Sequence, residues 1–280
     1  MLHFVQMAVH WPRLISYLSQ YHDPRGPAFR DEGFLVKTIL TDAFGGEDWP
    51  RPFHAYTTHP LRERGVGGIL AYCKRSAGDL TEALDSGQVP PMLRAAFIPD
   101  SLVGYPLAPP TEGRCYQFQV TLCPTVRQGD PRRERDAFLV EIGRRGGPSL
   151  VGIAPRGADA VVDRGDVYAG YLSRALSGGA VLEAATLRGF ALRDLARKGG
   201  GGKLGMVCFP EVTIDGILRV SDPGRFMAML GSGVGRGPGP VPTRVPGAAP
   251  CLAESIAPWA ISHRLSHRSA GTEARPRLRP

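Results

Sequence analysis

The order of predicted strands and helices constrains the fold of this 280-residue chain more than any other feature. Leu2–His10 alternates between apolar and polar residues, as a half-buried strand does. Asp31–Phe44 has apolar residues at helical spacing, acidic residues at its start and two glycines after its end, which together predict a helix. The same criteria predict two strands, a helix and a strand in the rest of the first 125 residues: Phe53–Thr58, Gly68–Lys74, Asp79–Leu84 and Arg114–Thr125.

A similar order follows in the second half of the chain. The elements predicted there are a strand, a helix, three strands and a helix: Phe138–Ile142, Asp166–Leu176, Ala180–Leu192, Lys203–Cys208, Ile214–Val220 and a helix that begins near Pro223. A turn near Pro210 joins the last two strands, and Ser221 or Asp222 caps the final helix. Strand, helix, strand, strand, helix, strand is the order of the ferredoxin-like fold. We therefore predict an α+β protein with two tandem ferredoxin-like (RRM-like) domains and antiparallel sheets.

Changes in composition predict the domain boundaries. An Arg-rich linker, residues 127–137, separates an N-terminal domain, residues 1–126, from a C-terminal domain, residues 138–237, which ends in a Gly-rich loop. Prolines then recur every two to four residues over Pro238–Pro250, so neither helix nor sheet can continue there. The ferredoxin-like order requires one more strand at this point, and the sequence has no strand pattern there. Residues 238–280 are therefore predicted to be a disordered or out-of-frame tail.

The net charge of +8 is spread unevenly along the chain. Residues 231–280 contain seven arginines and two glutamates, and therefore hold +5 of this charge. Residues 1–230 hold only +3. If the folded part binds a nucleic acid, we expect it to do so through individually placed arginines and a glycine loop rather than through bulk charge.

The composition also excludes several classes of protein. With 42% hydrophobic and 21% charged residues, the chain is too apolar to be disordered and too charged to be a membrane protein. The five cysteines contain no CxxC pair, so neither a disulfide framework nor a structural zinc site is expected. The His263/His267 pair has metal-ligand spacing but lies in the tail without a third ligand. These features predict a cytoplasmic protein without a metal, a cofactor or a membrane contact.

Three residues are candidates for chemistry. Lys37 lies on the polar stripe of the predicted helix Asp31–Phe44, where it is either a solvated side chain or a group that holds a phosphate. His22 precedes this helix in a loop that can fold over the helix start, and His54 lies at the end of a predicted strand. Either histidine can act as an acid or a base, although strand-end histidines are mostly structural.

Glycines and arginines supply the candidates for phosphate binding. The loop Gly231–Gly237 offers free N–H groups and close backbone approach, unless it is simply the cap of the preceding helix. In this loop the candidates for phosphate contacts are Gly233, Gly235 and Arg236. The other candidates are basic residues, which either contact a phosphate backbone or belong to solvated loops: Arg127, Arg132, Arg133 and Lys203.

The segment Val207–Gly237 resembles the closing segment of the CasE family, the endoribonuclease that processes repeat RNA in type I-E CRISPR Cascade. The shared pattern is a strand that ends in Phe, a G-x-L-x-V-x-D-P run, a short helix and a G-V-G motif: Val207–Phe209, Gly216–Pro223, Arg225–Leu230 and Gly233–Gly235. Looser similarity covers Tyr116–Pro124, Gly33–Phe44 and Arg51–Phe53.

This resemblance implies two ferredoxin-like domains that bind an RNA hairpin and other Cascade subunits. It also implies metal-independent cleavage in which the 2′-hydroxyl beside the scissile phosphate is the nucleophile. The family carries a Tyr and, three residues later, a His on the first helix, and the matching positions here are Phe34 and Lys37. We therefore expect Lys37 to be the active-site residue on this helix, with His22 or His54 as its auxiliary.

Two other functions remain open. A non-catalytic RNA-binding Cascade subunit would keep the fold and the partners but lack the cleavage chemistry, as the absence of the Tyr/His pair suggests. A basic ferredoxin-like module that binds another RNA or DNA is the second. Cleavage of the cognate repeat RNA distinguishes the enzyme from the first alternative, and the neighbouring genes distinguish it from the second.

Overall fold

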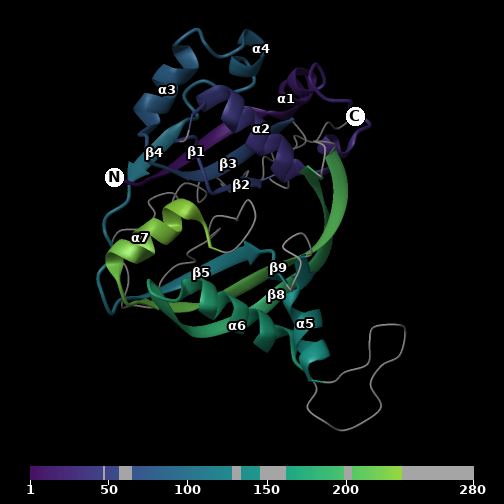
Figure 1. The fold of residues 1–280 in the computed structure, drawn as a ribbon. Helices are drawn as coiled ribbons and strands as arrows, with labels where there is room; N and C mark the ends of the chain where they lie inside the picture. Colours follow the sequence, from purple (N-terminus) through teal and green to yellow (C-terminus); the bar gives the residue numbers. More distant parts are fainter. Residues whose placement is uncertain (47, 57–64, 128–133, 146–161, 199–203, 235–280) are drawn as a thin grey trace, which may run out of the picture.

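A computed structural model describes residues 1–46, 48–56, 65–127, 134–145, 162–198 and 204–234 of the chain. Two α+β halves lie one above the other in Figure 1. The residues that follow α7, including the predicted tail 238–280, lie outside the described part.

The first half contains a four-stranded antiparallel sheet with the order β2-β3-β1-β4. This is the strand order of a ferredoxin-like domain. Its elements are β1 His3–His10, α1 Trp11–Leu18, the 3₁₀ helix η1 Pro27–Arg30, α2 Glu32–Phe44, β2 Phe53–Tyr56, β3 Val66–Cys73, α3 Ala77–Asp85, α4 Pro91–Arg94 and β4 Val103–Pro106.

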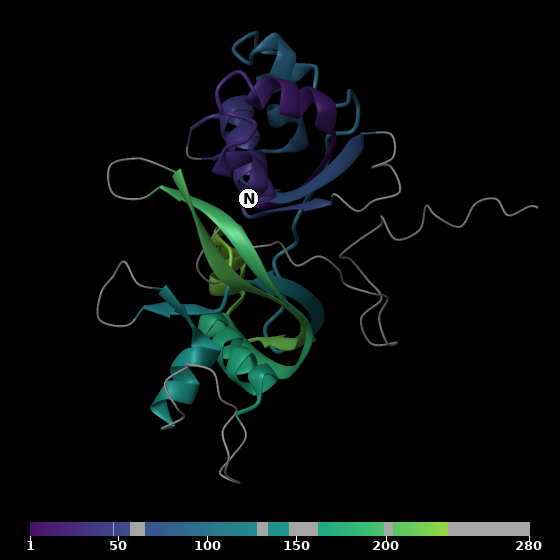
Figure 2. The same ribbon diagram turned by 90° about the vertical axis from the view of Figure 1, so that its right-hand side faces the viewer.

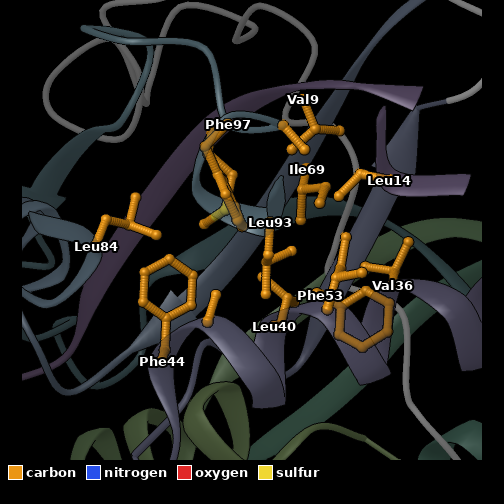
Figure 3. Packing of buried hydrophobic residues seen from close by; sticks show 14 of the residues in the cluster. Val9, Leu14, Val36, Leu40, Phe44, Phe53, Ile69, Leu84, Leu93 and Phe97 are labelled. Atoms are coloured by element: carbon orange, nitrogen blue, oxygen red, sulfur yellow. The ribbon is translucent and has the colours of Figure 1, made fainter. Parts of the chain in front are cut away.

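The core of this half lies between one face of the sheet and the helices (Figure 3). Alternate residues of β1 and β3 point into it, because successive side chains of a strand lie on opposite faces. Helix α2 contributes the largest set of buried side chains: Leu35, Val36, Ile39, Leu40, Ala43 and Phe44. The predicted helix is thus confirmed, with Asp31 as the residue that caps it.

The second half contains a three-stranded antiparallel sheet with the order β5-β9-β8. Its elements are β5 Cys115–Leu122, β6 Thr125–Arg127, β7 Glu134–Asp136, α5 Ala137–Arg144, α6 Arg164–Leu176, β8 Ala180–Lys198, β9 Leu204–Val220 and α7 Pro223–Ser232. The order β5-β9-β8 corresponds to β1-β3-β2 of the first half. Both halves therefore follow the predicted ferredoxin-like order, and in the described residues the second sheet has no strand equivalent to β4.

The boundary predicted at residue 126 is wrong. Residues 115–122 were expected to be the last strand of the first domain, but as β5 they pair with β9 from Cys115↔Arg219 to Leu122↔Val212. The last strand of the first half is instead the short β4, which pairs with β1. An alternating pattern identifies a strand but not its partner, and the four residues of β4 are hidden within a Pro-rich stretch.

Two predicted elements of the second half are also wrong. Phe138–Ile142 was expected to be a strand and is part of helix α5, because Asp136 caps this helix by accepting a hydrogen bond from the N–H of Phe138 (2.9 Å). The predicted turn near Pro210 does not exist, since β9 runs through it. Pro210 lies beyond the end of β5, where β9 is paired only with β8, and proline is tolerated on such an open edge.

Candidate functional site

The first turns of α2 carry one predicted reactive side chain, Lys37, and contact a second, His22, through Phe34. The ring of His22 contacts the ring of Phe34 edge-on, with centroids 5.9 Å apart. Lys37 follows Phe34 by three positions, so the two side chains lie on the same side of the helix. Lys37 is exposed, whereas Phe34 and His22 are half-buried. This end of α2 therefore presents an imidazole and an ammonium group, which can move a proton and stabilise a negative charge.

The structure does not bring His54 to this place. His54 pairs with Leu70, while its neighbour Phe53 belongs to the core that α2 covers. Because strand residues alternate between faces, His54 lies on the face of the sheet opposite to α2. Burial lowers the pKa of His54 below its ordinary value of 6.5, so its imidazole is neutral at pH 7.

The long hairpin formed by β8 and β9 reaches from the second half to the start of α2 (Figures 1 and 2). The backbone N–H of Ala196 in β8 donates a hydrogen bond to Oδ2 of Asp31, at 2.8 Å. The other oxygen of Asp31 accepts from the N–H of Phe34, at 3.0 Å, and caps α2. A single carboxylate thus joins the hairpin to the helix that carries Lys37.

Charged and aromatic side chains surround this junction. Arg197 lies 3.5 Å from the carboxylate of Glu134 on β7, and its guanidinium lies over the ring of Phe209, 4.7 Å from the centroid. Burial raises the pKa of Cys123 to about 11, and the nearby carboxylate of Glu211 adds to this, while Arg197 opposes it. The thiol of Cys123 is therefore protonated at neutral pH and is not a nucleophile.

A second surface lies where α7 meets the first half. A cleft of about 790 Å³ is lined by residues of both halves, which include Asp48, Trp49, Arg51, Lys74, Met227, Gly231 and Ser232. The guanidinium of Arg51 lies over the Trp49 ring at 5.4 Å, and Lys74 pairs with Asp48 at 3.1 Å. Gly233 ends α7 with a φ of 85°, which favours glycine.

Comparison with known proteins gives a match to one protein family. Residues 106–239 match the family described as CRISPR associated protein. The matched segment, which resembles a CRISPR-associated protein, makes up just under half of the chain. No curated protein matches its sequence.

Three solved structures are similar to this chain. CRISPR endoribonuclease Cse3 bound to a 19-nucleotide RNA shares 15% identity over 85% of this chain and 94% of its own, with a TM-score of 0.47. Cse3 of Thermus thermophilus, bound to an RNA that represents a pre-cleavage complex, shares 16% identity over 84% of this chain and 93% of its own, with a TM-score of 0.44. Cas6e of Escherichia coli K-12 shares 14% identity over 85% of this chain and 93% of its own, with a TM-score of 0.43.

The structure describes only some of the predicted phosphate-binding residues. Arg127 ends β6 and lies 3.4 Å from Glu134, with half of its side chain exposed. Gly233 ends α7 next to the cleft described above. The other predicted residues lie outside the described ranges: Arg132, Arg133, Lys203, Gly235 and Arg236.

Sequence reasoning missed several residues of these two surfaces. Asp31 was recognised only as an acidic residue at a helix start, and its partner Ala196 is 165 positions away. Arg51 and Lys74 come together with α7 only through the packing of the two halves. In the described part of the chain, no three His, Cys, Asp or Glu side chains form a metal site, and no helix is long and apolar enough to span a membrane.

Proposed function

We propose that this CasE-like chain binds the repeat hairpin of precursor CRISPR RNA, cleaves it without a metal ion and remains bound as a Cascade subunit. The observation that carries this proposal is the placement of His22 and Lys37 at one end of α2, where the hairpin of the second half contacts the same helix. The family match and the resemblance of Val207–Gly237 to the CasE closing segment support it.

The proposed reaction is an attack of the RNA 2′-hydroxyl on the adjacent phosphate. The 2′-oxygen loses its proton and bonds to phosphorus, the bond to the 5′-oxygen breaks, and that oxygen gains a proton. The products are a 2′,3′-cyclic phosphate and a 5′-hydroxyl, and no water or metal is consumed. His22 can move one of these protons, and the ammonium of Lys37 can stabilise the charge on the phosphoryl oxygens or protonate the leaving oxygen.

Phe34 stands where the family has a tyrosine and can transfer no proton. In the structure it instead supports the ring of His22. The reactive groups are therefore a lysine on the helix and a histidine packed against the helix, in place of two side chains on the helix itself.

The test is to incubate purified protein with the repeat RNA of its own CRISPR array in EDTA. Cleavage at one phosphate, with a cyclic phosphate on the upstream product, supports the proposal. A matched RNA with a 2′-deoxy sugar at the scissile nucleotide should bind equally well and remain intact. Cleavage of that RNA at the same phosphate would contradict the proposed nucleophile.

A second candidate function is RNA binding without cleavage. Phe34 and Lys37, which replace the Tyr and His of the family, favour it. The same assay separates the two functions, because tight binding of repeat RNA that stays intact would establish the binding subunit.

A further inference from the structure

Asp31 is nearly buried, with 8% of its surface exposed, and it uses both carboxylate oxygens. Oδ1 accepts the hydrogen bond from Phe34 that caps α2, and Oδ2 accepts the bond from Ala196 of β8. A cap needs only one acceptor oxygen. The second bond is therefore additional to helix capping, and it connects the two halves of the molecule.

The hairpin end that meets Asp31 is itself held in place. Arg197, the residue after Ala196, pairs with Glu134 and stacks on Phe209. The side chain of Glu134 is 10% exposed, so this ion pair is partly shielded from water on one side. Both β8 and β9 also contact η1, the short helix that leads to Asp31. A displacement of the hairpin is thus passed to the start of α2.

We infer that Asp31 is a positioning residue, which holds the start of α2 in register with the β8–β9 hairpin. This inference rests on the proposed function. RNA held by the second half is then aligned with His22 and Lys37, neither of which Asp31 needs to touch. Correct alignment of reacting groups accelerates a reaction by large factors. The loss of this hydrogen bond should therefore slow cleavage more than it weakens RNA binding.

Two substitutions remove this bond from its two ends. Asn is as good a helix cap as Asp, but its amide has one acceptor oxygen, so Asp31→Asn keeps the cap and loses the bond to Ala196. Ala196→Pro removes the donor. Because the N–H of Ala196 bonds to Asp31, it takes no part in the pairing with β9, and proline is tolerated at such a position of an edge strand.

Asp163 offers a matched control. It caps α6 by accepting a hydrogen bond from the N–H of Asp166 at 2.9 Å, entirely within the second half. Asp163→Asn makes the same chemical change at a helix cap that does not join the two halves.

The experiment measures amide hydrogen exchange, RNA affinity and the single-turnover cleavage rate for the full chain and its variants. In Asp31→Asn, the Ala196 amide should exchange faster and cleavage should slow by about 10- to 100-fold, with the Kd changed by no more than about twofold. Ala196→Pro should slow cleavage similarly, and Asp163→Asn should leave the rate and the Kd unchanged.

Wild-type cleavage rates in both Asp31→Asn and Ala196→Pro would overturn the inference. So would an equal loss of rate in Asp163→Asn. If the wild-type chain binds the repeat RNA but leaves it intact, the proposed function fails, and the role of Asp31 in cleavage fails with it. If the wild type cleaves and the two variants cleave equally fast, only the inference about Asp31 fails.

Discussion

The two halves share one strand order but differ at the edge of their sheets. In the first half, β1 is paired with β3 on one side and with β4 on the other. In the second half, β5 is paired with β9, and no described strand occupies its other side. The helices that follow the third strand of each sheet differ in the same sense, since α3 buries Leu80 and Leu84 and α7 buries no side chain completely.

This difference suggests a division of tasks. The first half forms a closed scaffold that holds α2, and with it Lys37 and His22, in a fixed place. The second half extends the β8–β9 hairpin well beyond its own core, so that the hairpin contacts the first half. Under the proposed function, one half supplies the reactive groups and the other aligns them.

The largest predicted effect compares two buried leucines. Leu40 on α2 and Leu172 on α6 are each at most 1% exposed, so truncation to alanine should lower the free energy of unfolding by about 2–5 kcal/mol. The loss in Leu172→Ala should lie at the lower end of this range, because the open edge of the second sheet lets the residues around the cavity relax. Urea unfolding measures both, with Leu139→Ala on the exposed side of α5 as control, and a larger loss at Leu172 would contradict the comparison.

The next effect concerns the two histidines of the first half. His22→Gln should slow cleavage about 100-fold, because it removes the proposed proton-transfer group that packs against Phe34 of α2. His54→Gln should retain most of the activity, since His54 lies on the opposite face of the sheet. Single-turnover cleavage rates at saturating protein measure both variants. A greater loss of rate in His54→Gln would place the chemistry on the face of the sheet opposite to α2, which contradicts the account.

A smaller effect is expected in hydrogen exchange along the two equivalent strands. Every second amide of β5 points to the unpaired edge, so these amides should exchange at least about tenfold faster than those of β1 between His3 and Gln6. Uniform protection along β5 would show that another segment covers this edge, and the contrast between the halves would then be wrong.

The smallest effect is a pH dependence of the first half. His54 has a lowered pKa in the folded state, so the unfolded chain binds a proton more readily near pH 6.5. Stability should therefore fall as the pH decreases through about 6.5 towards the lower folded pKa. His54→Gln should flatten this part of the stability profile, and an unchanged profile would contradict the role of burial.

Much of the fold followed from local patterns, and the errors have local causes. Helix α2 was predicted because its apolar spacing, its acidic start and its closing glycine agree. Helix α1 was missed, since the cap position, His10, makes no side-chain cap hydrogen bond and a Pro-rich loop follows the helix. The run Phe138–Ile142 has the residue preferences of a strand, which the cap at Asp136 overrides.

The candidate site was predictable only where its parts are close in sequence. His22 was expected to fold over the start of α2, and the structure places it against Phe34. The bond between Asp31 and Ala196 depends on the packing of two halves, and no local pattern contains that information. For the same reason, periodicity could not show that β5 pairs with β9 and belongs to the second half.

The most direct test of this division of tasks is the metal-free cleavage rate of bound repeat RNA in Lys37→Ala, with Lys37→Arg as the matched control. Lys37→Ala should slow single-turnover cleavage about 100-fold, because the charge that stabilises the transition state is lost. Lys37→Arg keeps the charge and should recover part of the rate, while the Kd of both variants stays close to that of the wild type. Cleavage by Lys37→Ala at the wild-type rate would show that the start of α2 is not where the chemistry occurs.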